Sequence, residues 1–303
     1  MSRIRSIFAG TLIPLSGCIG SAMAQSAAAV QGSTDAGIHH HHFADGEVLR
    51  FFYEDTDTVF QTVGVDGTIQ AGNGIEVQEI QIPVEIQVRA QDGGLIRALT
   101  ILPEAQYREA APNALAQTQF QILPPLIPGY QTDFSYTYKD DTDAMSRLQD
   151  IFSSIRSTNV GSFLFFKDQD IHQMQQSAEQ IPDGLLPGQT SFTEPHDVPG
   201  LGGDFKAAAS QLIYQGVQDF EGQRAGYFKV ISLGNQFTTS TMTTFTNFFF
   251  TMYVALDGPK QGLLLYGEGQ ETATVLQPTP AGSASGGFTP LVALQRQFSI
   301  RLK

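Results

Sequence analysis

Residues 80–88 read Ile80-Gln81-Ile82-Pro83-Val84-Glu85-Ile86-Gln87-Val88, and this stretch decides the fold class. Isoleucine and valine occupy every second position, with polar residues and one proline between them. Side chains of a β-strand point alternately to the two faces of its sheet, so the pattern predicts a strand with one buried and one exposed face. This alternation is typical of antiparallel sheets. Because Pro83 cannot donate a backbone hydrogen bond, we expect the strand at an edge of the sheet.

The same alternation continues in the second half of the chain. In residues 243–256 the apolar side chains of one face are those of Phe248, Phe250, Met252, Val254 and Leu256. Turn signals such as Asp92-Gly93-Gly94 separate the strands, because glycine adopts the backbone angles that tight turns need. The chain therefore reads as a series of antiparallel hairpins.

Between residues 143 and 181 the apolar spacing changes to three or four residues, the period of an α-helix. One stripe consists of Met145, Leu148, Phe152 and Ile155, and a second of Ile171, Met174, Ala178 and Ile181. We therefore expect two short amphipathic helices packed on a sheet. The predicted fold is mainly β (α+β), one domain of residues 46–303 built as a large curved antiparallel sheet, a two-sheet sandwich or a half-barrel. A division into two subunits, 46–128 and 129–303, also fits.

The composition excludes several classes of protein. The 303 residues include 17 Lys and Arg against 30 Asp and Glu, a net charge of −13, so the chain lacks the basic surface that nucleic acids and anionic lipids need. Cys18 is the single cysteine, which excludes disulfide frameworks, cysteine-based zinc sites and iron–sulfur clusters. We expect no cofactor.

The first 24 residues have the features of a secretory signal peptide. Arg3 and Arg5 precede the apolar residues 7–15, and Ala22-Met23-Ala24 forms a cleavage site. Leu15-Ser16-Gly17-Cys18 also resembles the lipobox of bacterial lipoproteins, in which the cysteine is acylated. We therefore expect export to the periplasm or cell surface, with cleavage at the first site or a lipid anchor at the second. The rest of the chain has no apolar stretch long enough for a transmembrane helix.

Residues 25–45 lack an apolar period and are expected to be a disordered tether. This segment contains four adjacent histidines, His39, His40, His41 and His42. Adjacent imidazoles can chelate a transition-metal ion weakly, but a flexible segment does not hold them in the geometry of a structural site. The run is therefore interpreted as a solvated linker, a weak metal or pH-sensitive site, or an added affinity tag.

A series of elements in the second half of the chain carries a family resemblance. Ile181-Pro182 and Leu186-Pro187-Gly188-Gln189-Thr190-x-Phe192 precede a strand with Tyr214 and a Phe220-Glu221-Gly222 turn. This order resembles exported, β-rich envelope proteins of bacteria that contain domains of unknown function. Gln189 and Phe192 stand where those proteins carry an acidic residue and a tryptophan. The resemblance implies an envelope location and a curved antiparallel sheet, and it brings no catalytic residues.

Motifs of common enzymes are missing from the sequence. Gly282-Ser283-Ala284-Ser285-Gly286 has alanine where a nucleophile elbow needs serine. The predicted domain contains only His172 and His196 as candidate bases for a serine hydrolase. A periplasmic hydrolase using one of these histidines is the alternative function.

The leading interpretation is a non-enzymatic envelope protein. Phe248, Phe250 and Met252 lie on one face of a predicted strand, where they would fill the core or face an apolar ligand such as a lipid, or an envelope partner. A purely structural surface protein is a further alternative. No metal site is expected apart from the weak candidate in the histidine run.

Overall fold

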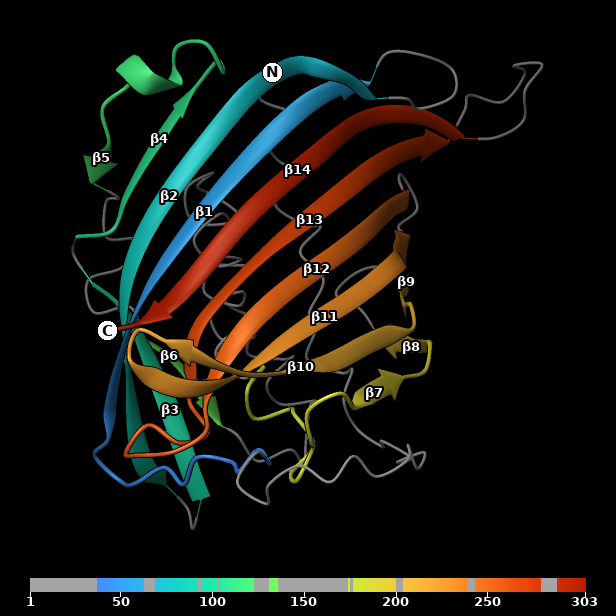
Figure 1. The fold of residues 1–303 in the computed structure, drawn as a ribbon. Helices are drawn as coiled ribbons and strands as arrows, with labels where there is room; N and C mark the ends of the chain where they lie inside the picture. Colours follow the sequence, from blue (N-terminus) through green and yellow to red (C-terminus); the bar gives the residue numbers. More distant parts are fainter. Residues whose placement is uncertain are drawn as a thin grey trace.

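Every hydrogen-bonded ladder in the structure joins antiparallel strands (Figure 1). The computed structural model describes residues 37–62, 69–91, 94–102, 104–122, 131–135, 174, 177–199, 204–238, 243–278 and 288–303. The strands are β1 (Val48–Thr62), β2 (Ile69–Gln91), β3 (Gly94–Ile101), β4 (Gln106–Ala110), β5 (Gln121–Ile122), β6 (Gln131–Ser135), β7 (Thr190–Thr193), β8 (His196–Pro199), β9 (Asp204–Ala207), β10 (Ser210–Phe220), β11 (Gln223–Thr238), β12 (Thr243–Ala255), β13 (Leu264–Pro278) and β14 (Phe288–Leu302). They form one sheet of 14 strands, so the antiparallel sheet expected from the alternating residues is confirmed in its one-sheet form.

The first and last long strands of the chain lie side by side in the middle of this sheet (Figure 1). The strand order is β5-β4-β2-β1-β14-β13-β12-β11-β10-β7, and among the described residues the two end strands are not paired with each other. The β1–β14 and β3–β6 ladders join residues 46–128 to residues 129–303. The sheet is therefore continuous across the boundary between the two expected subunits.

Strand β2 lies inside the sheet, and the expected edge position is wrong. Along one side it pairs with β1, and along the other it pairs first with β4, over Val77–Gln81, and then with β3, over Val84–Gln91. Pro83 lies where β2 changes from one neighbour to the other, and its carbonyl oxygen accepts a bond from Leu102 N. The N–H and C=O of one strand residue point to the same side. The missing donor of Pro83 therefore faces this junction, where it interrupts neither ladder.

The two faces of the sheet differ in burial, and we call them the inner and the outer face. The inner face carries the alternating apolar side chains of β1, β2, β12 and β14, including Tyr53, Ile82 and Phe250, which are at most 2% exposed. The outer face carries the residues between them, such as Glu54 and Gln81. Figure 1 shows that the long strands bend together along their length. The hydrophobic core lies against the inner face and runs across the sheet from β2 to β10.

The expected second helix does not extend to Ile181. Met174 is helical, but residues 177–180 form turns, and Ser177 N donates to Met174 O at 3.2 Å. Pro182 disfavours a helical conformation at the residue before it. Three residues of the predicted stripe, Met174, Ala178 and Ile181, are nevertheless buried in the core at 4%, 2% and 1% exposure.

The first expected helix lies outside the described residues. Within the described part of the chain, apart from the single helical residue Met174, the helical element is the short 3-10 helix η3 (Leu115–Gln117). No helix in the ranges that the structure describes is long and apolar enough to cross a membrane.

Residues 37–45 are packed onto the domain, so the expectation of a disordered tether is wrong for this part, while residues 25–36 lie outside the description. Ile38 is fully buried in the core, and its carbonyl oxygen accepts a bond from Gly184 N at 3.0 Å. His40 Nε2 lies 2.7 Å from Ile181 O. The apolar side chains of Ile38 and Phe43 and these hydrogen bonds hold the segment, and none of these features has a periodic signal in the sequence.

His41 joins this segment to two parts of the domain. Its Nδ1 lies 2.9 Å from Gln261 O, and its Nε2 lies 2.8 Å from Glu47 Oε1. Both ring nitrogens face acceptors, so the protonated ring satisfies both contacts at once. Gly262 lies directly beneath, in a left-handed conformation with φ of +78°, and a Cβ there would be 2.2 Å from His41 N. Two histidines of the run, His40 and His41, therefore make structural contacts with the domain.

We expect Gly262→Ala to displace residues 37–45 and to destabilise the protein by roughly 3 kcal/mol or more, because a Cβ overlaps the backbone of His41. Gly258→Ala is the matched control: its φ is +73° but no atom lies within 4 Å of its Cβ position, so only the left-handed strain of about 1–2 kcal/mol applies. Urea denaturation measures both. Equal losses of stability would contradict the close contact with His41.

Candidate functional site

The residues expected to face an apolar ligand lie in the core. Phe250 and Met252 of β12 are 2% and 1% exposed on the inner face, and Phe248 packs partly buried against the same cluster. The rings of Phe248 and Phe250 stack on Phe298 of β14, with centroids 5.8 and 6.2 Å from it. Strand β13 lies between β12 and β14.

Two glycines of β13 make this stacking possible. A Cβ on Gly267 would be 2.4 Å from the Phe250 ring, and a Cβ on Gly269 would be 2.4 Å from the Phe298 ring. The rings therefore lie flat over β13 and fill the space that side chains would occupy. An apolar ligand would have to displace aromatic rings that already pack on one another, and its binding here stays a prediction.

The other predicted site residues are not brought together. Cys18 and His172 lie outside the described residues, and His196 lies in β8, paired with Ala207 of β9. His39 lies 3.8 Å from Asp183 at the surface. Among the described residues, no group of three or more His, Cys, Asp and Glu side chains could hold a metal ion.

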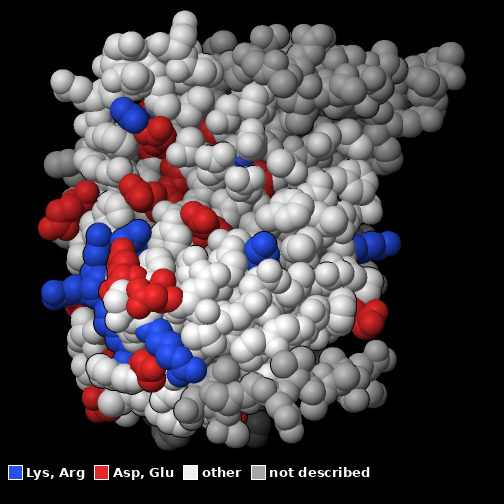
Figure 2. Space-filling model, in the orientation of Figure 1, with Lys and Arg blue, Asp and Glu red and all other residues white. Residues whose placement is uncertain are grey.

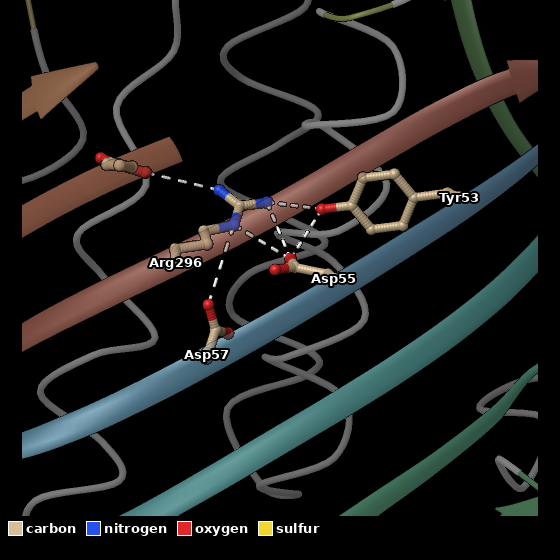
Figure 3. A network of polar contacts seen from close by, with 5 residues as sticks. Tyr53, Asp55, Asp57 and Arg296 are labelled. Carbon is tan, nitrogen blue, oxygen red and sulfur yellow. Dashed lines mark hydrogen bonds and ion pairs between the residues drawn. The ribbon is translucent and has the colours of Figure 1, made fainter. Parts of the chain in front are cut away.

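A buried ion network crosses β1, β14 and β13 on the inner face (Figure 3). Arg296 donates from Nε to Asp55 Oδ2 at 3.0 Å and from Nη2 to the Tyr53 hydroxyl at 2.5 Å. Tyr53 donates in turn to the same Asp55 oxygen at 2.7 Å. Asp57 and Glu271 lie at the two sides of the guanidinium, at 3.8 and 3.5 Å. The side chains of Arg296 and Asp55 are only 4% and 1% exposed.

This network serves the fold rather than an anionic ligand, because the guanidinium is surrounded by carboxylates of its own chain. The Phe298 ring covers it, with Arg296 Cζ 4.7 Å from the ring centroid. Its members come from three strands, so a shift of one residue in either ladder would turn one partner to the other face. The sequence offered one signal: Asp55 and Arg296 have opposite charge and occupy positions of the buried face in their strands.

A groove of about 670 Å³ lies on the outer face, and we call it the outer-face groove. Its floor consists of polar side chains from five adjacent strands: Glu54 and Thr56 of β1, Glu79 and Gln81 of β2, Gln297 and Ser299 of β14, Glu268 and Gln270 of β13, and Thr251 of β12. Phe249 of β12 forms one side, and Phe120, in the loop before β5, forms the other. From β2 to β12 the floor spans four strand spacings, about 19 Å.

The register of the ladders arranges these side chains in two rows across the strands. The first row is Glu79, Thr56, Gln297, Gln270 and Phe249, each residue directly opposite the next. The second row is Gln81, Glu54, Ser299, Glu268 and Thr251. The groove therefore presents one row of mainly uncharged groups beside a row that contains two carboxylates.

Each glutamate of the groove has a partner within the chain. Gln81 donates to Glu54 at 3.1 Å, the Tyr266 hydroxyl donates to Glu268 at 2.8 Å, and Arg108 forms an ion pair with Glu79. These bonds hold the carboxylates in place but leave acceptor positions open, because an ionised carboxylate has about four lone-pair sites.

Apart from Gln81, the uncharged side chains of the floor make no such bonds. Within the described part of the chain, no hydrogen bond of the side chains of Thr56, Ser299, Gln270, Gln297 or Thr251 is present. Amides and hydroxyls both donate and accept, so this floor can bond to a ligand with many hydroxyl groups. The alternating pattern does not mark these residues, because polar positions of a half-exposed strand have the same appearance as any solvent face. The available signal was their composition, since glutamine, threonine and serine replace the charged residues usual on such a face.

No protein-family model and no curated protein matches the sequence. Among solved structures, an outer membrane channel from Pseudomonas putida F1 aligns with 7% identity over 87% of this chain and 98% of the channel, with a TM-score of 0.21. A likeness at this TM-score carries no argument about fold or function.

We expect Arg296→Met to destabilise the protein by about 3–5 kcal/mol, because it leaves Asp55 and its neighbours buried without their cation. Arg301→Met on the same strand is the control: Arg301 is 42% exposed and pairs with the exposed Glu221, so its loss is expected to cost at most about 1 kcal/mol. The measurement is the free energy of unfolding in urea. Similar values for the two variants would show that the network does not hold the sheet together.

Proposed function

We propose that this protein is a non-enzymatic, exported protein of the cell envelope that binds an oligosaccharide in the outer-face groove. The observation that carries this proposal is the row of amide and hydroxyl side chains on the groove floor that have no hydrogen bond of their own within the described structure. Sugar rings carry hydroxyl groups that both donate and accept, which matches the chemistry of these side chains.

The size of the groove suits a short chain rather than a single sugar. Its floor is about 19 Å across the strands, and five strands contribute side chains to it. Binding sites of this size place a few polar groups so that they fix the orientation of the ligand. Gln270 and Gln297 lie directly opposite each other at the centre of the floor and are the groups best placed to do this.

Aromatic rings lie at both ends of the groove and favour sugars over fully polar ligands. Phe249 is 46% exposed on β12, although its ring is apolar. At the other end the Arg108 guanidinium lies 4.5 Å from the centre of the Phe120 ring. The C–H face of a sugar ring is apolar, so it can cover an exposed aromatic side chain while its hydroxyls bond to the floor.

The envelope location rests on the signal-like residues 1–24, with release after Ala24 or anchoring at Cys18. The domain would then meet the polysaccharides of the cell surface or periplasm. Both the proposed location and the chemistry of the groove therefore favour a saccharide ligand.

Calorimetric titration with neutral hexamers of glucose and N-acetylglucosamine tests the proposal. We expect at least one hexamer to bind, and the Gln270→Ala/Gln297→Ala double variant to bind it about tenfold or more weakly, because two amide contacts of about 0.5–1.5 kcal/mol each are lost. Gln295→Ala is the matched control, since Gln295 lies on the same face of β14 but does not line the groove.

Three outcomes would contradict the proposal. The first is the absence of binding by every hexamer at millimolar concentration. The second is an equal effect of the control and the double variant, which would place the sugar elsewhere. The third is release of shorter sugars during the titration, which would show a hydrolase and contradict the non-enzymatic role.

A further inference from the structure

The acidic side chains of the outer-face groove have no basic counterpart among its lining residues. The described residues that line the groove include Glu54, Glu79 and Glu268, but no Lys or Arg. Glu79 forms its ion pair with Arg108, which reaches it from β4. The negative charge of the groove is therefore concentrated on Glu54 and Glu268.

The sheet register fixes the distance between these two carboxylates. Glu54 of β1 and Glu268 of β13 both lie opposite Ser299 of β14, so their backbones are two strand spacings apart, about 9.6 Å. Both side chains are exposed on the outer face. One elongated ligand that crosses the strands would therefore pass both carboxylates.

The hydroxyl of Tyr266 lies beside these carboxylates and responds to their charge. It donates to Glu268 at 2.8 Å. The pKa of Tyr266 is raised to about 12, mainly by burial and then by the hydrogen bond to Glu268 and the charges of Glu268 and Glu54, while Arg301 opposes the rise. A negative field at this rim of the groove is consistent with the shift.

Charged side chains are distributed unevenly over the visible face of the molecule. Figure 2 shows acidic side chains, with Lys and Arg side chains beside them, over the part of the sheet that contains β1, β2 and β13, whereas the surface over β12 and β11 carries few charges. The carboxylates of Glu54 and Glu268 thus lie on the floor of the groove, between the aromatic rings of Phe120 and Phe249 at its two ends. An anionic sugar would be repelled by them.

From this arrangement, and resting on the proposed binding of an oligosaccharide, we propose that the ligand is an amino sugar chain whose protonated amines face Glu54 and Glu268. Its hydroxyls would bond to Gln270, Gln297 and Ser299, and its ring faces would cover Phe249 and Phe120. Hydrogen bonds between an ammonium and a carboxylate are roughly twice as strong as those between neutral groups. The carboxylates therefore select amino sugars over the neutral sugars that the amides alone would accept.

The test compares two hexamers with the same rings and different charge. At about pH 5.5 and low salt, where glutamates are ionised and free sugar amines are protonated, we expect the glucosamine hexamer to bind at least tenfold more tightly than the N-acetylglucosamine hexamer. The double variant Glu54→Gln/Glu268→Gln should bind the glucosamine hexamer at least tenfold more weakly. This variant should bind the two hexamers with affinities within about twofold of each other.

The control separates this site from the general attraction of a cation to an acidic protein of net charge −13. Glu104→Gln removes an exposed carboxylate outside the groove, and we expect less than a twofold effect. Screening provides a second measurement on the unmodified protein. Raising NaCl from about 50 to 500 mM should weaken binding of the glucosamine hexamer and leave the neutral hexamer unchanged.

The outcomes distinguish this inference from the function on which it rests. If both hexamers bind equally and the Glu54→Gln/Glu268→Gln variant behaves like Glu104→Gln, the amino-sugar assignment is wrong. The groove would still be the sugar site if Gln270→Ala/Gln297→Ala weakens both hexamers. If neither hexamer binds, both the assignment and the proposed function are overturned.

Discussion

The pairing of β1 with β14 is the constraint on which the rest of the structure depends. This ladder runs from Phe51 opposite Leu302 to Gln61 opposite Val292. It joins the β2–β4 side of the sheet to the β13–β10 side, and no other ladder of the main strand order connects them. The buried ion network and both rows of the outer-face groove cross it. Disruption of this ladder would therefore remove the core, the network and the groove together.

The same ladder builds two different environments on its two faces. Arg296 points inward to Asp55, while the next residue, Gln297, points outward to the groove floor. Alternation along the strand is strict, so the register that pairs the buried charges also sets the spacing of the groove residues. The cost of burying charges is high if their partners are misplaced, which penalises every shifted register. The ion network thus stabilises the arrangement of side chains on the opposite face.

The features that can be predicted from the sequence are those that depend on neighbouring residues in the chain. Alternation in residues 80–88 and 243–256 predicts strands because the side-chain period of a strand depends on its own residues alone. Prediction from the sequence fails where partners are distant. Pro83 reads as an edge residue unless one knows that β2 changes neighbours beside it, and His41 reads as part of a linker unless one knows that Gln261 and Glu47 lie next to it. The helical spacing of apolar residues before Pro182 correctly predicts that Met174, Ala178 and Ile181 are buried, but it does not predict the conformation of the chain there.

The candidate site was missed for a related reason. The sequence pattern predicts a ligand-facing surface at Phe248, Phe250 and Met252 because large apolar residues share one face there. Such residues usually lie in the core, as these do. A groove floor of glutamine, threonine and serine has no periodic signal of its own. It becomes visible only when Thr56, Gln297 and Gln270, which come from three strands, are placed side by side by their ladders.

The central position of β14 also determines the order in which the parts of the sheet can form. Ribosomes deliver the chain from its first residue onward, so β1, β2 and β10–β13 all leave the ribosome before residues 288–302. Until then β1 and β13 each lack the neighbour that lies between them, and the two parts of the sheet cannot join. The core, which runs across the sheet from β2 to β10, therefore stays incomplete until β14 has been synthesised. A late completion of the fold is compatible with the export that we propose, because a chain whose sheet is still in two parts is easier to unfold than the finished domain.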